Sequence, residues 1–450
     1  MKLRSIGVAL ALLLCAEGTS HANGRFPASN AITFDPSDPS RIYLRATFGL
    51  LVSTDGGRSW DWVCERSLGF SGPEDPTIGI FGDGSVVVSL FEGLAVSHDR
   101  ACSFSFVPGT TDKKIFVDVS VVRTNVLTAA AITSGYANKN DAAGNALFSS
   151  EVFVSRDYGK NWEKSGPSLD PTLLLQTVDV SPLIPNRIFI SATRGSAPNA
   201  NGVLLRSDDG GLTFTERPIP LTPKVERAPF IAALDPNDGD ALWVRTMGTV
   251  DQGARLLYTR DLGQTWKNTF QTKGPMKGFA LSEDGNTIFA GGPKDGVWSA
   301  EKKDAIANGP VLKVNDLAVA CLAYRKGELW ACSDEANGFT AGISTTQGRS
   351  WQPRAHLKDL RGPLACAAGT PTFELCRADW PQQRAFLGIE APSVMPDAST
   401  PTDAGPRPSQ ASASRCSCNA VGGSSSGAWR SVVLAAALVS MLRARRRVPR

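Results

Sequence analysis

Short apolar runs separated by tight polar turns recur along most of the chain. In the first unit, apolar runs at 32–34 and 41–44 flank a Pro- and Asp-rich turn at 35–40, and a third run follows at 50–52. Runs of this length, bounded by Gly, Pro, Asn and Asp, predict β-strands joined by hairpins. Similar turns lie at 82–84, near 123–124, and at 181–186, 235–240, 283–285 and 325–327. The pattern predicts seven units, with later third strands at 94–96, 152–154, 203–205, 256–258, 297–298 and 342–343.

An eight-residue motif follows the third strand in most units. Its pattern is Ser/Thr-x-Asp-x-Gly-x-x-aromatic, complete at 53–60, 155–162, 207–214 and 259–266 and weaker at 97–104 and 344–351. A short carboxylate and a hydroxyl can bond turn amides that strand pairing leaves free, and Gly supplies a positive φ. The aromatic residue begins the next strand and is expected to pack between neighbouring sheets. The motif residues are Ser53, Asp55, Gly57, Trp60, Asp99, Phe104, Ser155, Asp157, Gly159, Trp162, Ser207, Asp209, Gly211, Phe214, Thr259, Asp261, Gly263, Trp266 and Trp351.

This motif resembles the Asp-box, or BNR repeat, of sialidases, Vps10-like proteins, photosystem II assembly factor-like proteins and related β-propellers. The resemblance implies a propeller in which the boxes are structural, because similar boxes lie away from the active sites of the family. The sixth unit retains only Ser299 and Glu301 where a box should be.

The repeat length points to the same architecture. Seven units over about 325 residues give about 46 residues each, which suits a four-stranded blade. We therefore predict an all-β, seven-bladed β-propeller with four-stranded antiparallel blades over residues 23–390. Residues 361–388 are expected to supply strands that join the end of the ring to its start. A stack of separate β-sandwiches is the structural alternative, but it does not explain one turn motif recurring at blade spacing.

The two ends of the chain carry sorting features. Residues 1–22 read as a secretory signal peptide, with Lys2 and Arg4 before an apolar run and small residues before the cleavage point. A lipoprotein signal using Cys15 is the alternative. Residues 391–414, rich in Pro, Ser, Ala and Thr, predict a disordered linker.

Residues 415–450 combine Cys416 and Cys418 with a Gly/Ser spacer, a short apolar run and an Arg-rich tail. This order resembles the MYXO-CTERM sorting signal of myxobacterial surface proteins, which implies cleavage near the cysteines and transfer to the cell surface. A plain membrane tail is the alternative. We expect an exported protein, at the cell surface or outer membrane or extracellular, whose membrane contact involves only this segment.

The distribution of charge along the chain bears on which partners the protein can bind. The formal net charge is +4, but residues 1–22 carry a net +1 and residues 428–450 carry six arginines without an acid, so the remainder is mildly acidic. A nucleic-acid partner is therefore not expected.

The cysteines of the body predict three disulfides. Cys321 and Cys332 are expected to pair because they flank a two-residue turn equally, and Cys366 is expected to pair with Cys376, which leaves Cys64 with Cys102 by elimination. Sequence does not fix this connectivity. No metal site or cofactor is predicted, because the body has no CxxC and few histidines.

Catalytic residues are hard to assign. The sialidase resemblance implies an arginine cluster, a Tyr nucleophile paired with Glu, and an acid/base residue. Arg25-Phe26-Pro27 matches the arginine-containing family motif only in part, and of the five tyrosines only Tyr136 lies in a candidate face loop, with no Glu near it. A glycoside hydrolase with paired carboxylates stays open as the alternative function, since distant loops can bring acids together.

The leading prediction is a non-enzymatic module that binds a protein or a glycan, acting as a monomer. Long insertions at 133–147, 193–201 and 247–254 precede third strands in units three to five, which places them on the face opposite the boxes. The candidate binding residues are Tyr136, Asn138, Asn140, Arg194, Asn199 and Asp251. Solvated loops without a ligand are the alternative interpretation.

Overall fold

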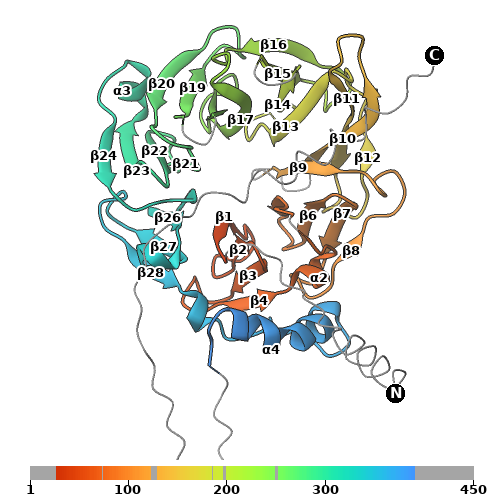
Figure 1. Cartoon of the computed structure of the whole chain (residues 1–450), viewed down its shortest axis with the longest axis vertical. Helices are drawn as coiled ribbons and strands as arrows, with labels where there is room; N and C mark the ends of the chain where they lie inside the picture. The colour runs from red at the N-terminus through yellow and green to blue at the C-terminus, as the bar shows by residue number, and fades with distance from the viewer. Residues whose placement is uncertain are drawn as a thin grey trace, which may run out of the picture. The chain divides into compact units, whose positions relative to one another are not determined.

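Seven four-stranded antiparallel sheets form the blades of a ring, which confirms the predicted fold class (Figure 1). The computed structural model describes residues 27–72, 74–122, 129–184, 186–195, 199–248 and 252–390. In each blade the first strand lies nearest the axis and the fourth lies at the rim (Figure 1). The predicted signal peptide (1–22), the linker (391–414) and the tail (415–450) with Cys416 and Cys418 lie outside the described residues. Within the described part of the chain, no helix is long and apolar enough to span a membrane.

Each blade takes its four strands consecutively from the sequence. Blades 1 to 3 comprise β1 (Ser29–Phe34), β2 (Ile42–Ala46), β3 (Gly49–Ser53), β4 (Asp61–Val63); β5 (Ile78–Ile80), β6 (Val86–Leu90), β7 (Gly93–Ser97), β8 (Ser105–Phe106); and β9 (Phe116–Val121), β10 (Ala129–Asn140), β11 (Ala146–Ser155), β12 (Glu163–Lys164). Blades 4 and 5 comprise β13 (Leu173–Val180), β14 (Ile188–Arg194), β15 (Asn201–Ser207), β16 (Thr215–Ile219); and β17 (Glu226–Leu234), β18 (Leu242–Gly248), β19 (Arg255–Thr259), β20 (Lys267–Gln271). Blades 6 and 7 comprise β21 (Gly278–Leu281), β22 (Thr287–Gly292), β23 (Gly296–Glu301), β24 (Leu312–Asn315); and β25 (Cys321–Arg325), β26 (Glu328–Cys332), β27 (Ala341–Ser344), β28 (Gln352–Ala355).

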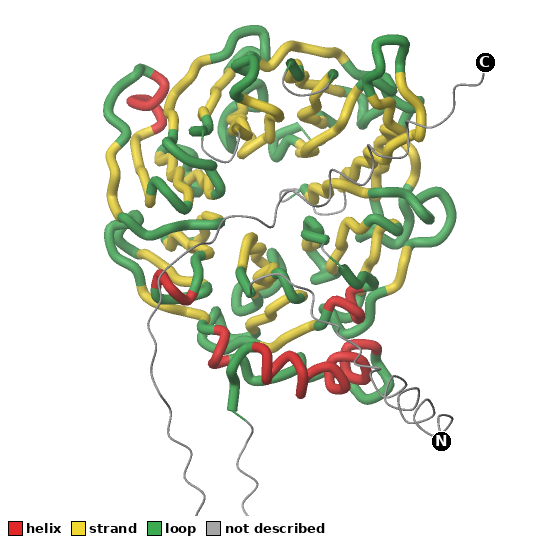
Figure 2. The backbone as a smooth tube through the Cα atoms, viewed as in Figure 1, coloured by secondary structure: helices red, strands yellow, loops and turns green. Residues whose placement is uncertain are grey.

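A few short helices connect or flank the blades. They are α2 (Glu65–Leu68), α3 (Lys302–Ile306), α4 (Arg377–Phe386), the 3₁₀ turns η1 (Glu335–Asn337) and η2 (Leu357–Asp359), and the π-helical turn η3 (Thr372–Cys376). Figure 2 shows the longest helical segment outside the ring, beside β4.

The middle strands are apolar at nearly every position because each sheet is covered on both faces by neighbouring blades. All five residues of β6 and of β7 are buried, whereas the rim strands β8 and β12 are exposed. A sheet buried on both faces loses the apolar–polar alternation of a half-exposed one. The core is thus a ring of apolar layers between blades, such as the layer that joins Phe81 of blade 2 with Phe153 and Trp162 of blade 3.

The eight-residue boxes close the turns between third and fourth strands by internal hydrogen bonds. In the first box, the Ser53 hydroxyl donates to Asp55 Oδ1 (2.8 Å) and accepts from the Gly57 amide (2.8 Å). Ser59 donates to Asp55 from its amide (3.0 Å) and from its hydroxyl (2.6 Å). Although burial would raise it, these bonds hold the pKa of Asp55 at about 2. The carboxylate is therefore ionised and occupied by its own turn, as a structural role requires.

The sixth blade has no box, and the position where a box would begin lies one residue after the predicted one. In blade 1 the box Ser53 pairs with Ile42, and in blade 6 the residue at that register is Ala300, which pairs with Ile288. The predicted remnant Ser299 is therefore one position out of register. Lys302 stands where the box aspartate would be, and α3 begins there. Without the hydroxyl and the carboxylate, the box turn has no internal acceptors and a helical turn replaces it.

Side-chain bonds also link the innermost strands of neighbouring blades. Each of these strands has a ladder partner on one side only, so its other edge carries free amides. Several of those amides are satisfied by the preceding blade. Examples are Val119 N, which donates to Thr77 Oγ1 (3.1 Å), Val178 N to Asp118 Oδ2 (2.8 Å) and Ile231 N to Thr177 Oγ1 (2.9 Å).

The ring is not closed by extra strands, so the prediction for 361–388 is wrong. Blades 1 and 7 already hold four strands each, from residues 29–63 and 321–355. The segment 361–388, here called the clip, forms one parallel bridge between Pro363 and Trp62 and then turns into η3 and α4. Arg361 pairs with Asp61 through two hydrogen bonds (2.9 and 2.5 Å). The clip thus covers the outer edge of β4 rather than completing a blade.

Two disulfides fasten the clip to the start of the chain. Cys64 is bonded to Cys376 and Cys102 to Cys366, with sequence separations of 312 and 264 residues. The predicted pairs Cys64–Cys102 and Cys366–Cys376 are wrong because they assumed local partners, whereas the ring brings its end beside its beginning. The predicted hairpin disulfide Cys321–Cys332 is confirmed, and these two residues are direct cross-strand partners.

Replacing Trp162 by Ala should destabilise the protein by about 3–5 kcal/mol, because its ring is buried in the layer between blades 2 and 3. The matched control is Trp266→Ala, which removes a box aromatic that is only half-buried. Urea unfolding followed by circular dichroism measures both. Equal losses for the two variants would contradict the packing described.

Removing the two clip disulfides by Cys→Ala at 64, 102, 366 and 376 should lower the free energy of unfolding by about 2–5 kcal/mol. The control removes Cys321 and Cys332, which close a loop of only 11 residues. Because the loss of unfolded-state entropy grows with loop length, the clip variant should have the lower urea midpoint. Equal midpoints would show that the clip does not hold the ring closed.

Candidate functional site

Two surfaces can serve as functional sites: the loop face, which carries the β2–β3-type connections of the blades, and the opposite box face. On the loop face, β10 and β11 continue past the ring as a hairpin. The Tyr136 ring is 51% exposed there, and its hydroxyl donates to Asn140 Oδ1 (3.0 Å). Asn138, at the exposed end of the same strand, has a positive φ of 55°. The predicted residues Tyr136, Asn138 and Asn140 therefore lie together on one exposed hairpin.

Arg194 is near this hairpin but is already engaged. Phe148, the cross-strand partner of Tyr136, donates its amide to Pro171 O (2.8 Å), which joins the hairpin to the segment before β13. Arg194 bonds Asp170 and Glu216 through Nη2 (3.0 Å to each) and Thr172 through Nε (3.0 Å). The pKa of Arg194 is raised by these bonds against the effect of burial. Its positive charge is paired with two carboxylates of the protein, Asp170 and Glu216.

The remaining predicted residues are less informative. Asn199 is exposed beside β15, and Asp251 lies outside the described residues. Asp170 and Glu216 also line a hollow of about 320 Å³ between blades 3 and 4, whose wall includes the exposed Leu212. Of the predicted binding residues, Tyr136, Asn138 and Asn140 therefore lie together in blade 3, and Arg194 and Asn199 lie in blade 4.

Sequence reasoning missed two exposed apolar side chains of blades 2 and 3 on the loop face. Phe91 is 51% exposed and Ile115 is 38% exposed. Ile115 accepts from the amide of Ser134 (3.1 Å) and lies against the backbone of Gly135, next to Tyr136. The sequence did contain a sign of Phe91, because a large apolar residue stands there in a hairpin turn, where polar residues are usual. We define the loop patch as Phe91, Ile115, Tyr136, Asn138 and Asn140.

One carboxyl near the axis has an unusual environment. Asp118 lies on β9, the innermost strand of blade 3, and burial raises its pKa to about 6. Bonds from Val178 N and the Thr77 side chain, and the charge of Arg45, oppose that rise. Among described carboxyl groups with a resolved shift, no other pKa is raised, so Asp118 is the described carboxyl whose shift has the direction expected of a general acid.

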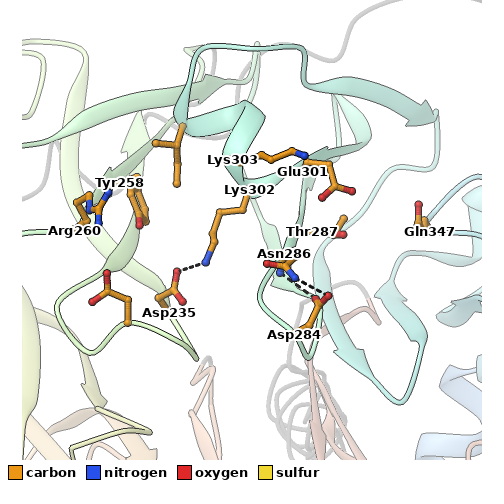
Figure 3. A pocket seen from close by; sticks show the side chains of 12 residues that line it. Asp235, Tyr258, Arg260, Asp284, Asn286, Thr287, Glu301, Lys302, Lys303 and Gln347 are labelled. Atoms are coloured by element: carbon orange, nitrogen blue, oxygen red, sulfur yellow. Dashed lines mark hydrogen bonds and ion pairs between the residues drawn. The ribbon is translucent and has the colours of Figure 1, made fainter.

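A second hollow lies on the box face between blades 5 and 6, where the sixth box is replaced by α3 (Figure 3). Its volume is about 900 Å³. At its floor Lys302 Nζ lies 2.8 Å from Asp235 Oδ2, and the Asp235 carboxylate is fully buried. Figure 3 shows the Lys302 side chain crossing the hollow to reach Asp235 from the α3 side. We call this hollow the box-face groove.

Two of the acids that line the groove, Asp235 and Asp284, are bonded within the protein. Asp235 is neutralised by Lys302. The hydroxyl of Ser282 and the amides of Asn286 bond Asp284 and lower its pKa, so this carboxylate is ionised at neutral pH. A general acid needs the opposite shift.

Three of the five tyrosines do not fit a sialidase-like nucleophile. Burial raises the pKa of Tyr43 and of Tyr258 to about 12, and it also raises the pKa of Tyr324. A Tyr nucleophile needs a proton that leaves easily. Arg25 and Phe26 lie outside the described residues. Within the described ranges, no group of three or more His, Cys, Asp or Glu side chains is placed to hold a metal ion.

Comparison with known proteins supports the fold. No protein-family model matches the chain, and no curated protein sequence matches it. An ancestral GH74 enzyme superposes with a TM-score of 0.53 at 16% identity, over 74% of this chain and 47% of that one. Hydrazine synthase from Kuenenia stuttgartiensis superposes with a TM-score of 0.51 at 12% identity, over 74% of this chain and 99% of that one. The chain spans about half the length of the GH74 enzyme. The superpositions show a shared β-propeller fold, and at identities of 16% and 12% they show the fold alone.

Replacing Asp118 by Asn should stabilise the protein at about pH 7.5, and the gain should shrink toward about pH 4.5. The folded pKa of about 6 exceeds the ordinary value of 3.8, so the folded state binds a proton that the unfolded state has lost. The contribution of Asp118 to the free energy of unfolding is therefore present at low pH and is lost as the pH rises through about 6. Urea unfolding at both pH values measures the effect.

The control for this prediction is Asp141→Asn, because hydrogen bonding by Asn145 lowers the pKa of Asp141. That variant should lose stability at neutral pH rather than gain it. A loss for Asp118→Asn at both pH values would show that its charge is needed where it lies.

Proposed function

We propose that this protein is an exported, non-catalytic propeller that binds a glycan through the loop patch on blades 2 and 3. The observation that carries the proposal is the exposed Tyr136, whose hydroxyl bonds Asn140, with Ile115 against the neighbouring Gly135 and Phe91 exposed on the same face in blade 2. A fixed aromatic face beside amide side chains matches a sugar, which has an apolar ring face and hydroxyls that both donate and accept.

Two charged groups near the loop patch are paired within the protein, while Lys139, between Asn138 and Asn140, is exposed. The one cation predicted for binding, Arg194, is committed to Asp170 and Glu216. The buried Glu151 at the base of the hairpin is likewise held by Lys164 (2.8 Å) and by Lys114. The side chains left to a ligand are largely those whose hydrogen bonding needs no counter-charge.

A glycoside hydrolase is the second candidate, and two observations favour it. The raised pKa of Asp118 is typical of a general acid, and the fold is shared with a GH74 enzyme. Asp118 lies between inner strands, and its Oδ2 already accepts the amide of Val178 from the next blade (2.8 Å), so this carboxyl has a structural use. We therefore favour binding over hydrolysis.

Export and display complete the proposal. Three disulfides suit an oxidising compartment. The clip ends at the point from which the predicted linker and the predicted sorting segment continue. We propose that the mature propeller is carried at the cell surface on that linker.

Replacing Tyr136 by Ala should weaken glycan binding at least about tenfold, because it removes the stacking face. Asn140→Ala should weaken it less, because the ring remains but loses its fixed orientation. Leu312→Ala is the control, since Leu312 is 61% exposed on the rim of blade 6, away from the loop patch. Binding is measured on a glycan array and then by calorimetry with the best oligosaccharide.

Two results would contradict the proposal. Unchanged affinity in Tyr136→Ala would remove the loop patch as the site. Turnover of a chromogenic glycoside that is lost in Asp118→Asn would establish the hydrolase instead.

A further inference from the structure

We infer that the box-face groove between blades 5 and 6 is a second, separate binding site for a neutral oligosaccharide. It lies on the opposite face of the ring from the loop patch and shares no residue with it. The inference takes its ligand class from the chemistry of the groove, so it can hold even where the loop patch fails.

The groove exists because one blade abandons the turn that the others use. Ala300 and Lys302 replace the hydroxyl and the carboxylate that fasten a box, and α3 takes the place of the turn. Elsewhere, as at Ser53 and Asp55, the box is held by its own bonds. A departure from a local rule that the rest of the fold obeys is most often found at a functional site.

The floor of the groove is rigid and already neutral. Asp235 accepts from the Asn237 amide through Oδ1 (3.0 Å) and from Lys302 through Oδ2 (2.8 Å). The Lys302 amide donates to Asn286 O (2.7 Å) and its ammonium donates to Asp235. An ammonium has three N–H donors, and among the described residues Asp235 is the one acceptor bonded to it, so donors remain for a ligand. A ligand oxygen can therefore bind at the floor without breaking the ion pair.

The walls present donors and acceptors of both charge signs. Arg260 comes from the box of blade 5, Glu301 and Lys303 flank Lys302, and Gln347 comes from the box of blade 7 (Figure 3). Within the described residues, Arg260, Glu301 and Lys303 have no ion-pair partner. Binding groups that are not used by the fold are therefore available on both sides of the floor.

This lining selects against several ligand classes. Cations and carboxylates are nearly balanced, so the groove has no net field to concentrate a polyanion. Tyr258 and Ile306 are its main apolar surfaces, so an apolar ligand would leave the charged groups desolvated and unpaired. A hydroxyl-rich ligand can satisfy carboxylate acceptors and guanidinium donors at once. A volume of about 900 Å³ lies in the range of ligand pockets and is large enough for more than one sugar ring.

The test uses the full chain and calorimetry with neutral β-glucan, xylan and mannan oligosaccharides of about six sugars. Arg260→Ala should weaken binding at the groove about tenfold, because it removes a charged hydrogen-bond donor. The matched control is Arg156→Ala, which changes the residue at the same box position in blade 3, outside the groove. Gln347→Ala is the second groove variant, since Gln347 is exposed and Ala keeps a side-chain-bearing residue at this left-handed backbone position, where φ is 55°. Lys302 is left intact, because removing it would leave the buried Asp235 charge unpaired.

The outcomes separate this inference from the proposed function. Binding at two sites per chain, one weakened by Arg260→Ala and Gln347→Ala and the other by Tyr136→Ala, supports both. One site lost in Tyr136→Ala and unchanged in both groove variants overturns the groove and leaves the loop patch. One site lost in the groove variants alone supports the groove and overturns the loop patch. Absence of binding to every oligosaccharide overturns both, and equal weakening by Arg156→Ala overturns the groove assignment.

Discussion

The closure of the ring is the constraint on which the rest of the structure depends. Each blade is apolar on both faces, so no blade is stable without two neighbours, and the first and last blades must find each other. They meet in a layer that contains Trp60 of blade 1 and Trp330 of blade 7. The clip then locks this seam through Cys64–Cys376 and Cys102–Cys366. Since no strand is exchanged between the first and last blades, packing and covalent bonds take over the role that strand pairing has within a blade.

A closed ring also explains why functional groups are confined to its two faces and its axis. The layers between blades are filled by apolar side chains, and the inner strands are linked by bonds such as that from Val178 to Asp118. What remains for a ligand is the loop face, where hairpins such as β10–β11 extend freely, and the box face, where six blades repeat one turn. The box-face groove arises where blade 6 breaks that repetition.

The charged residues are the reason that we propose binding rather than catalysis. Asp55, Asp284, Asp235 and Arg194 are each bonded within their own surroundings, and the carboxylates among them with a resolved shift, Asp55 and Asp284, have lowered pKa values. Hydrolysis by two acids needs one pKa raised and a partner kept ionised across the substrate. Asp118 meets the first condition alone. Exposed neutral groups such as Tyr136, by contrast, need no such tuning.

The sequence by itself determined the blade count, the strand order and the box turns, because these depend on contacts between residues that are close along the chain. Ser53, Asp55 and Gly57 meet within one turn, and Cys321 and Cys332 meet across one hairpin, so spacing alone predicts both. Only the tertiary structure decided the partners of Cys64 and Cys102, the helical clip, and the engagement of Arg194 by Asp170 and Glu216. The box-face groove belongs to the same class, since Lys302 and Asp235 are 67 residues apart. Such contacts follow from how neighbouring blades pack, which no local pattern encodes.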